Sequence, residues 1–405
     1  MTTAAKRPLK QQFLIDAAIM LHRYGTPSHR LERVMDEVSQ GLNVHSAFLY
    51  TPTALVISLD EDSAASEMTV IRRVDSGSVD VGKVIELGRV LGQVARGEVT
   101  ADEAMPIIHR IDVAPSMYGP WTYGLACATA CAAVAVFFGG TVQEWIAAAV
   151  VGILVTVMEL LHARWKLEKG LLEPIAGVVA SLSSILIARS FVGMDDRLVT
   201  LAGLILLIPG LRLTVALTEL AVGHLSAGVA RLAGAMVSLA TLFIGVAFVW
   251  RMIDPLRVAD DAGADLNVRA FWIALAVAPI AFAIVFRAGP KQWPIIMLVS
   301  YLGVLVSRSM ELRFGVEVGA FLGALTIGCV SNLYARVRDI PAMVLLTPGM
   351  LILLPGSLGY RSLAALLERE TLEGVQLGFS MVVIGLSLVG GLLVSNAIVP
   401  PRRVL

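Results

Sequence analysis

A stripe of small and polar residues marks one face of an apolar helix in the middle of the chain. His224, Gly228, Arg231, Ala235 and Ser238 are separated by four, three, four and three positions, the spacing of one helical face. Glycine on such a face leaves room, and arginine offers charge to a carboxylate. Close helix packing is the alternative, because small residues let two backbones approach. An arginine seven positions after a histidine favours the wall of a polar path over packing alone.

Carboxylates in or beside apolar segments supply the opposite charge. Glu219 precedes His224 by five positions and is suited to exchange protons, or to pair with Arg231 across a helix break. An ionisable side chain in a membrane span costs at least ~2.5–3.5 kcal/mol, so it usually faces a water-filled or paired interior. Glu173 and Glu317 lie near the ends of apolar segments. For these two, a side chain that extends to water at the membrane boundary explains the carboxylate as well as a functional role does. The candidate substrate and proton-coupling residues are Glu219, His224, Arg231, Arg212, Glu173 and Glu317.

The elements that carry these residues are predicted to span a membrane. Of 405 residues, 57% are hydrophobic and 16% are charged, and the mean hydropathy is +0.78. Soluble domains carry about 25% charged residues, so this chain cannot cover itself with a water-compatible surface. From Trp121 onward we expect ten apolar segments, several near the ~20 residues that cross a bilayer core. They cover about 121–138, 145–161, 171–188, 198–217, 228–250, 271–287, 294–307, 315–333, 341–356 and 375–396.

The first 117 residues predict a small soluble α+β domain. Helical spacing up to Gly25 ends one helix, and Thr26-Pro27 supplies an N-cap and a first-turn proline for the next. Short β-branched or aromatic runs at 47–50, 55–59 and 68–74 predict strands. Thr100 with Glu103 forms a capping box for a last helix. The domain is expected to fold on its own and to serve gating or regulation.

Two places in the apolar part repeat. Pro209-Gly210 recurs as Pro355-Gly356, and Glu173 has a counterpart in Glu317, at separations of 146 and 144 positions. These repeats predict two halves of five helices each, at 118–250 and 271–399. Because five is odd, the second half is inverted relative to the first, an architecture that places a substrate site near the midplane. The motif positions are Pro209, Gly210, Gly223, Gly228, Pro355 and Gly356.

Three blocks in the same order resemble the threonine/serine exporter family. The stretch 24–32 with Pro52-Thr53 is similar to its N-terminal domain, which fungal pheromone-regulated membrane proteins share. The stretch 208–231 resembles its most recognisable membrane motif, and Gly323, Gly328 and 354–360 resemble its second half. The family often has aspartate where this chain has Glu219, which leaves substrate preference open.

The resemblance implies a secondary transporter that exports small polar metabolites, threonine and serine above all, driven by the proton gradient. Related two-chain forms imply dicarboxylates such as succinate as the alternative, and a channel or scaffold with a regulatory N-terminal domain is a further one. An enzyme is not expected, because His162 and His224 have no HExxH motif or Cys/His cluster beside them. No cofactor or metal is expected.

The partners that follow are the lipid bilayer and a small amino acid or carboxylate. A net charge of zero offers no basic field for nucleic acid. The sequence leaves a homo-oligomer open. Loop charges do not orient the chain, with ten basic residues on one side and nine on the other. Met1–Lys10 lacks the apolar core of a signal peptide, so we expect a multi-pass protein of the inner or plasma membrane with a cytoplasmic N-terminal domain.

Overall fold

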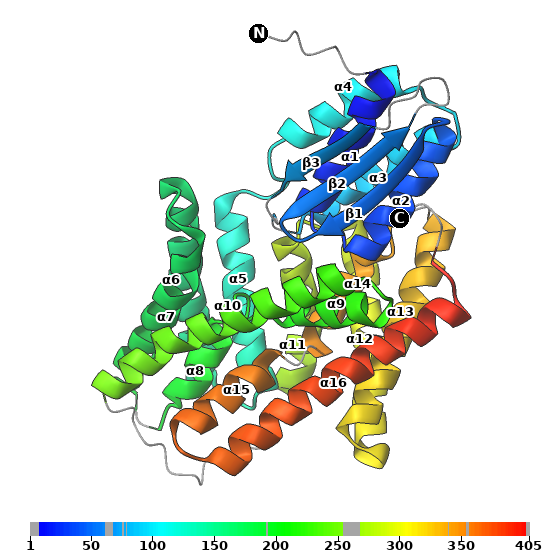
Figure 1. Cartoon of the computed structure of the whole chain (residues 1–405). Coiled ribbons are helices and arrows are strands. Elements are labelled where there is room, and N and C mark those ends of the chain that lie inside the picture. The colour runs from blue at the N-terminus through cyan, green and yellow to red at the C-terminus, as the bar shows by residue number, and fades with distance from the viewer. Residues whose placement is uncertain are drawn as a thin grey trace.

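The chain begins with a layered unit of helices and strands. A computed structural model describes residues 8–60, 68–74, 77, 79–191, 193–253, 268–338, 340–353 and 356–401. A three-stranded antiparallel sheet in the order β1-β2-β3 is packed on one face by helices (Figure 1). The elements of this N-terminal unit are α1 (Leu9–Arg23), α2 (Ser28–Gly41), β1 (His45–Thr51), β2 (Ala54–Asp60), β3 (Met68–Arg73), α3 (Val81–Ala95) and α4 (Ala101–Val113).

The sheet has one buried face. In the central strand Leu55, Ile57 and Leu59 are fully buried, and the residues between them are half-buried. Ile57 pairs with Phe48 on one side and with Val70 on the other. The three strands lie where the β-branched runs predict them, because alternation of this kind places every second side chain against the helices.

Local signals set the helix ends, with one correction. The capping box of Thr100 and Glu103 is present at the start of α4, as predicted. The predicted N-cap at Thr26 is wrong: Pro27 is the N-cap of α2, without a side-chain cap, and Ser28 opens the helix. The first-turn N–H groups of α2 therefore need acceptors from elsewhere.

The described part of the remaining chain is almost entirely helical, and eight helical stretches in it are long and apolar enough to cross a membrane. They account for the many large apolar side chains that remain exposed. The helices are α5 (Pro120–Phe137), α6 (Val142–Trp165), α7 (Leu172–Ala188), α8 (Asp196–Gly203), α9 (Gly210–Ala221), α10 (Leu225–Met252), α11 (Val268–Val285), α12 (Trp293–Phe314), α13 (Val316–Arg338), α14 (Met343–Met350), α15 (Gly356–Leu367) and α16 (Thr371–Ile398).

Three predicted segments differ from the observed helices. The fourth, 198–217, is not continuous: it divides into α8 and α9, because Pro209 lacks an N–H and restricts the residue before it. The ninth divides into α14 and α15 and runs on to Leu367 rather than ending at 356. The seventh extends from 307 to Phe314 as part of α12. Its Arg308 guanidinium lies 5.2 Å from the centroid of the Phe271 ring, and the charge does not end the helix.

The N-terminal unit rests on one end of the helical bundle (Figure 1). The backbone N–H of Val81 donates to the carbonyl of Phe286 over 3.0 Å, and Arg287 Nη1 lies 3.1 Å from Asp80 Oδ2. Ala227 and Met343 belong to the same buried cluster as the core of the N-terminal unit. The two parts are thus joined by backbone, charge and apolar contacts.

Candidate functional site

A tight reversal between α9 and α10 positions the central charged pair. α9 ends at Ala221, Gly223 adopts a left-handed conformation with φ +91°, and α10 begins at Leu225. Gly228 then packs closely against α9, since an added Cβ would lie 2.7 Å from Leu220 Cγ. This approach lets the first turns of α10 run beside the last turns of α9.

Glu219 and Arg231 face each other across this break. Arg231 Nε donates to Glu219 Oε2 over 2.9 Å, and Nη2 donates to Oε1 over 3.0 Å. The Glu219 side chain is fully buried, and that of Arg231 is 17% exposed. A bidentate pair of this geometry is among the stronger charge-assisted contacts in proteins.

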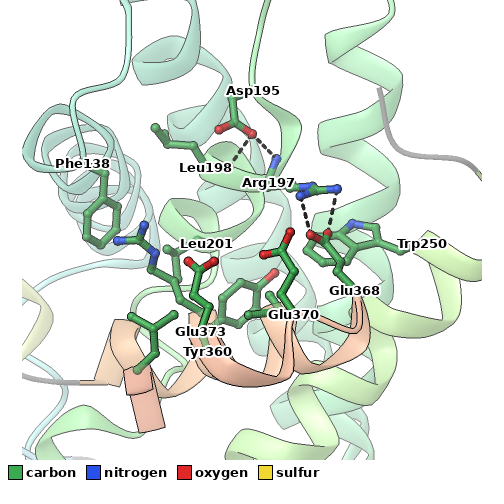
Figure 2. Close-up of a pocket in the computed structure, with 14 residues that line it drawn as sticks. Phe138, Asp195, Arg197, Leu198, Leu201, Trp250, Tyr360, Glu368, Glu370 and Glu373 are labelled. Atoms are coloured by element: carbon green, nitrogen blue, oxygen red, sulfur yellow. Dashed lines mark hydrogen bonds and ion pairs between the residues drawn. The ribbon is translucent and has the colours of Figure 1, made fainter. Parts of the chain in front are cut away.

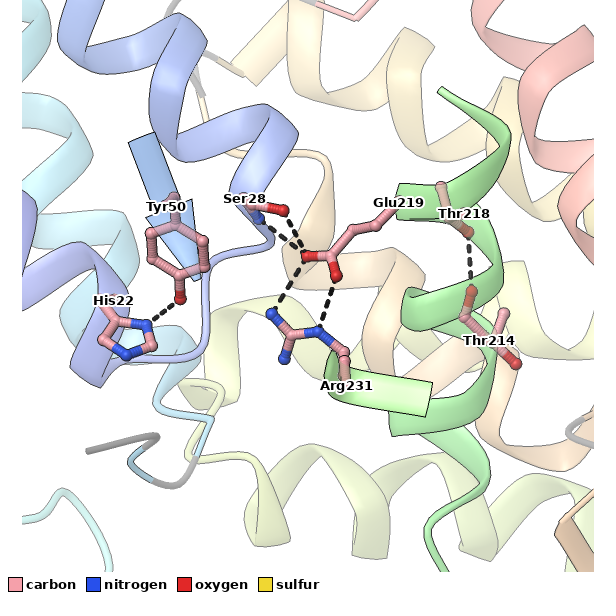
Figure 3. Close-up of polar contacts among 7 residues, drawn as sticks. All are labelled: His22, Ser28, Tyr50, Thr214, Thr218, Glu219 and Arg231. Atoms are coloured by element: carbon pink, nitrogen blue, oxygen red, sulfur yellow. Dashed lines mark hydrogen bonds and ion pairs between the residues drawn. The ribbon is translucent and has the colours of Figure 1, made fainter. Parts of the chain in front are cut away.

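The N-terminal unit completes the coordination of Glu219. Ser28 donates twice to Oε1, from its backbone N–H over 3.0 Å and from its hydroxyl over 2.6 Å (Figure 3). The N-cap residue Pro27 provides no side-chain acceptor, so the Glu219 carboxylate accepts from the Ser28 N–H at the first turn of α2. The carboxylate also lies at the positive end of the helix dipole. The buried charge is therefore matched by four hydrogen bonds, two of them from another part of the chain.

Histidines surround this contact. His224 Nδ1 lies 3.4 Å from Glu32 Oε2, and its ring centroid is 6.2 Å from that of His29. Burial, followed by the charge of Arg30, lowers the pKa of His29 to about 3, so that its imidazole is neutral. Burial also raises the pKa of Glu32, against the opposing effect of His224.

A cavity of about 100 Å³ lies beside His29, between the N-terminal unit and α9, α14 and α16. We call it the N-side cavity. Its polar lining consists of His29, Arg30, Thr214, Thr218, Thr347 and Asn396. His29 Nδ1 is buried without a hydrogen-bond partner among the described residues, and the Arg30 guanidinium has no ion-pair partner in the same part of the chain. Figure 3 shows Thr214 and Thr218 on a different side of α9 from Glu219.

The other predicted residues lie apart from this cavity. Ser238 donates to Glu173 Oε1 over 2.9 Å, which ties α10 to α7. Arg212 is exposed on α9, and Glu317 is exposed at the start of α13. Glu173 and Glu317 thus differ in their surroundings, although the sequence pairs them.

The predicted stripe on α10 packs and pairs rather than lining the N-side cavity. Arg231 and Ser238 bond to carboxylates, Gly228 touches Leu220, and Ala235 is 1% exposed. None of these residues lines the N-side cavity. Of the motif positions, Pro209 and Gly210 stand at the start of α9, Gly356 begins α15, and Pro355 lies outside the described residues.

Sequence reasoning missed the contribution of the N-terminal unit. Ser28, His29 and Arg30 lie in the stretch that carries the family resemblance, yet the sequence predicts only a gating or regulatory role for the unit and no site residue in it. Their types hold a signal: a serine, a histidine and an arginine directly after a proline at a helix start. Nothing local in the sequence shows that this helix start meets Glu219.

Apolar helices around buried ion pairs define the class as a multi-pass membrane protein. Residues 12–253 match the ThrE sequence profile of threonine/serine exporters, and residues 271–398 match a second profile, "Threonine/Serine exporter, ThrE". The chain belongs to the threonine/serine exporter family.

Several relatives with similar sequences come from fungi. An uncharacterized protein of Schizosaccharomyces pombe is 23% identical over 96% of this chain and 51% of its own length. Pheromone-regulated membrane protein 10 of Kluyveromyces lactis is 25% identical over 97% of this chain and 44% of that protein. The chain thus spans about half the length of these relatives, and the likeness extends well beyond the N-terminal block. No solved structure matches the chain.

Proposed function

We propose that the protein is a secondary transporter that exports small zwitterionic metabolites, threonine and serine foremost, coupled to the proton gradient. The observation that carries the proposal is the N-side cavity, where the short helices α9 and α14 meet beneath the N-terminal unit. Transporters place substrates where interrupted helices leave backbone and polar side chains free.

The lining suits a small hydroxylated amino acid. The Arg30 guanidinium offers a cation to the substrate carboxylate, and the threonine hydroxyls and Asn396 offer hydrogen bonds to a substrate hydroxyl. Apolar side chains such as Met343 and Leu346 complete the walls. A site of this kind favours a substrate with few atoms and one carboxylate.

An inverted arrangement of two halves is part of the proposal. α9 and α15 both have 12 residues, and α10 and α16 both have 28. The two interruptions also approach each other, because an added Cβ on Gly356 would lie 2.9 Å from Gly210 Cα. Equal lengths and a contact between equivalent glycines are what a two-fold relation between halves predicts, with ten spans in all.

Glu219 is the group that we expect to couple protons to export. Its carboxylate holds the first turn of α2, and the next residues of that helix, His29 and Arg30, line the N-side cavity. Protonation of Glu219 would remove the negative charge that Ser28 and Arg231 share. The N-terminal unit would then loosen at the cavity, and deprotonation would restore the contact.

The N-terminal unit is proposed to lie in the cytoplasm, with the bundle in the inner or plasma membrane. In this orientation the N-side cavity opens toward the side from which an exporter collects substrate. The unit acts as a gate, which agrees with its hydrogen bonds to a buried membrane-helix carboxylate rather than to solvent.

Dicarboxylate export is the second candidate, and one observation favours it. None of the described residues lining the N-side cavity is Asp or Glu, whereas Arg30 is present. An ammonium group would have to bind hydroxyl or amide oxygens there, and a second carboxylate would avoid this requirement.

Reconstituted proteoliposomes with an imposed pH gradient test the proposal. Radiolabelled threonine, serine and succinate are compared with and without an uncoupler, in the wild type, in Arg30→Gln and in the exposed control Arg89→Gln. We expect uncoupler-sensitive threonine transport that Arg30→Gln reduces and Arg89→Gln keeps. Succinate transport alone would select the second candidate, and downhill flux that ignores the uncoupler would indicate a channel.

A further inference from the structure

A second cavity lies at the end of the bundle opposite the N-terminal unit. It encloses about 310 Å³, and its walls come mainly from α8, α10, α15 and the start of α16 (Figure 2). We call it the far-side cavity. None of the predicted site residues lines it, although Tyr360 lies in the stretch 354–360 that carries the family resemblance.

The two cavities are lined by equivalent helices, with the contributions of the two halves interchanged. The N-side cavity is built on α9, α14 and α16, and the far-side cavity on α15, α8 and α10, which are their counterparts in the other half. At a separation of 146 positions, Thr214 corresponds to Tyr360 and Thr218 to Ala364, and all four residues line their cavities. Trp250 of the far-side cavity corresponds to Asn396 of the N-side cavity in the same way.

The helix reversals beside the two cavities repeat the same packing. An added Cβ on Gly228 would lie 2.7 Å from Leu220 Cγ, and one on Gly374 would lie 2.6 Å from Leu366 Cγ. Gly228 and Gly374 are again separated by 146 positions, as are Leu220 and Leu366. The correspondence of the cavities thus follows from repeated backbone geometry and not from lining residues alone.

The far-side cavity carries charges of both signs that are not consumed by pairing. Arg197 pairs with Glu368 over 2.7 Å, and Asp195 caps the start of α8. This leaves Arg361 without an ion-pair partner among the described residues, together with Glu370 and Glu373. The hydrogen bond and charge of Glu373 raise the pKa of Glu370, since two neighbouring carboxylates resist joint ionisation. A bound ammonium would relieve that repulsion.

Two buried aromatic side chains in the wall carry polar atoms that form no hydrogen bond to the described residues. Tyr360 is 2% exposed and Trp250 is 6% exposed. Within the described part of the chain, neither the Tyr360 hydroxyl nor the Trp250 Nε1–H has a hydrogen-bond partner. Buried polar atoms are rarely left unsatisfied in proteins, so both groups indicate that the cavity receives a polar ligand. Figure 2 shows Tyr360 beside Glu370 and Glu373.

We propose that the far-side cavity is a second binding site for a zwitterionic amino acid, with Arg361 facing the carboxylate and Glu370 and Glu373 facing the ammonium. Trp250 Nε1–H donates to the carboxylate, and the Tyr360 hydroxyl contacts either group. This inference rests on the proposed function: the site is the release-side counterpart of the N-side cavity. It also accounts for a difference between the two cavities: carboxylates line the far-side cavity, whereas none of the described residues lining the N-side cavity is Asp or Glu.

Equilibrium binding of radiolabelled threonine to the purified full-length protein tests the second site. We expect two equivalents per chain in the wild type. Arg361→Gln should weaken one equivalent about tenfold, as should Glu370→Gln with Glu373→Gln, because a hydrogen bond to a charged group is lost. The control is Arg189→Gln, an exposed arginine at the end of α7 that should keep both equivalents. 1-Amino-2-propanol and 3-hydroxybutyrate, which each lack one charge, should compete poorly.

Intrinsic fluorescence supplies a second readout that needs no charge variant. Threonine should change the emission of the wild type, and Trp250→Phe should remove most of that change. The second site is overturned if the wild type binds one equivalent of threonine that Arg361→Gln retains, and if Trp250→Phe leaves the fluorescence response to threonine unchanged. Threonine export into vesicles would in that case still support the proposed function. Competition by 1-amino-2-propanol alone would instead make the cavity a site for cations and would contradict the zwitterion assignment.

Discussion

Ser28 donates two hydrogen bonds to Glu219, a carboxylate 191 residues further along the chain. One partner opens a helix of the N-terminal unit, and the other is fully buried in α9. The link is selective for ionisation, because an ionised carboxylate accepts from both donors of Ser28 and from Arg231 at once. The coupling proposal depends on this property.

Removing the charge of Glu219 should abolish proton-coupled export. Glu219→Gln leaves Arg231 buried opposite a neutral amide, and loss of one partner of a buried pair costs about 3–5 kcal/mol. Proteoliposomes should show threonine flux that no longer responds to the pH gradient. Glu219→Asp is the matched control and should keep partial coupling. Full gradient-driven export by Glu219→Gln, at normal abundance in the membrane, would remove Glu219 from the coupling step.

Arg231→Lys should weaken export without abolishing it. Lysine keeps the charge but replaces two parallel N–H···O contacts by one, so the geometry toward Glu219 is lost. Export rates measured at equal protein density should fall to an intermediate value between wild type and Glu219→Gln. A rate equal to the wild type would mean that bidentate contact is not required.

Ser28→Ala should loosen the N-terminal unit from the bundle. The substitution removes the 2.6 Å hydroxyl contact but keeps the backbone N–H contact, and a buried acceptor that loses a donor costs about 1–3 kcal/mol. Hydrogen exchange should show faster exchange in the first turns of α2. Ser226→Ala, at an exposed position of α10, serves as the control. Unchanged protection of α2 in Ser28→Ala would contradict a latch at this contact.

Acidification should destabilise the folded chain through His29. Its pKa of about 3 in the fold lies below the ordinary 6.5, so the unfolded chain binds the extra proton more readily. Stability is therefore complete above pH 6.5 and falls as the pH drops toward 3. At pH 5.5 the loss is about 1.4 kcal/mol, from one unit of pH below the ordinary pKa. Thermal unfolding of wild type and His29→Gln, above pH 6.5 and at pH 5.5, measures this loss. An equal loss of stability in both proteins would assign the effect to other groups.

The sequence predicted the fold where signals are local. Strand alternation around Ile57 and the capping box of Thr100 identified elements of the N-terminal unit, because each depends on neighbours within a few residues. The helix interruption after Gly203 was less accessible. Proline marks where a helix weakens, but only packing decides whether it bends or separates into two helices.

The site could be predicted only in part. Glu219 and Arg231 were accessible because a charge in an apolar segment needs a partner, and the structure supplies that partner within the same helix pair. Arg30 and Tyr360 were not accessible, since each acquires its surroundings from elements far away in the chain. An arginine after a helix start reads as a solvated charge until the docking surface is known.

The contact between Gly210 and Gly356 gives the last prediction. Gly356→Ala would bring a Cβ to 2.8 Å from Ile208 Cγ2 and 2.9 Å from the Gly210 Cα, and backbone cannot yield as a side-chain end can. We expect about 1–3 kcal/mol of destabilisation from overpacking and a loss of export. Gly234→Ala on α10 is the matched control, because nothing lies within 4 Å of an added Cβ there and alanine favours the helix. Thermal unfolding and export are measured for both variants. If Gly356→Ala is as stable and as active as Gly234→Ala, the two interruptions do not need their close approach, and the central contact between the halves loses its proposed role.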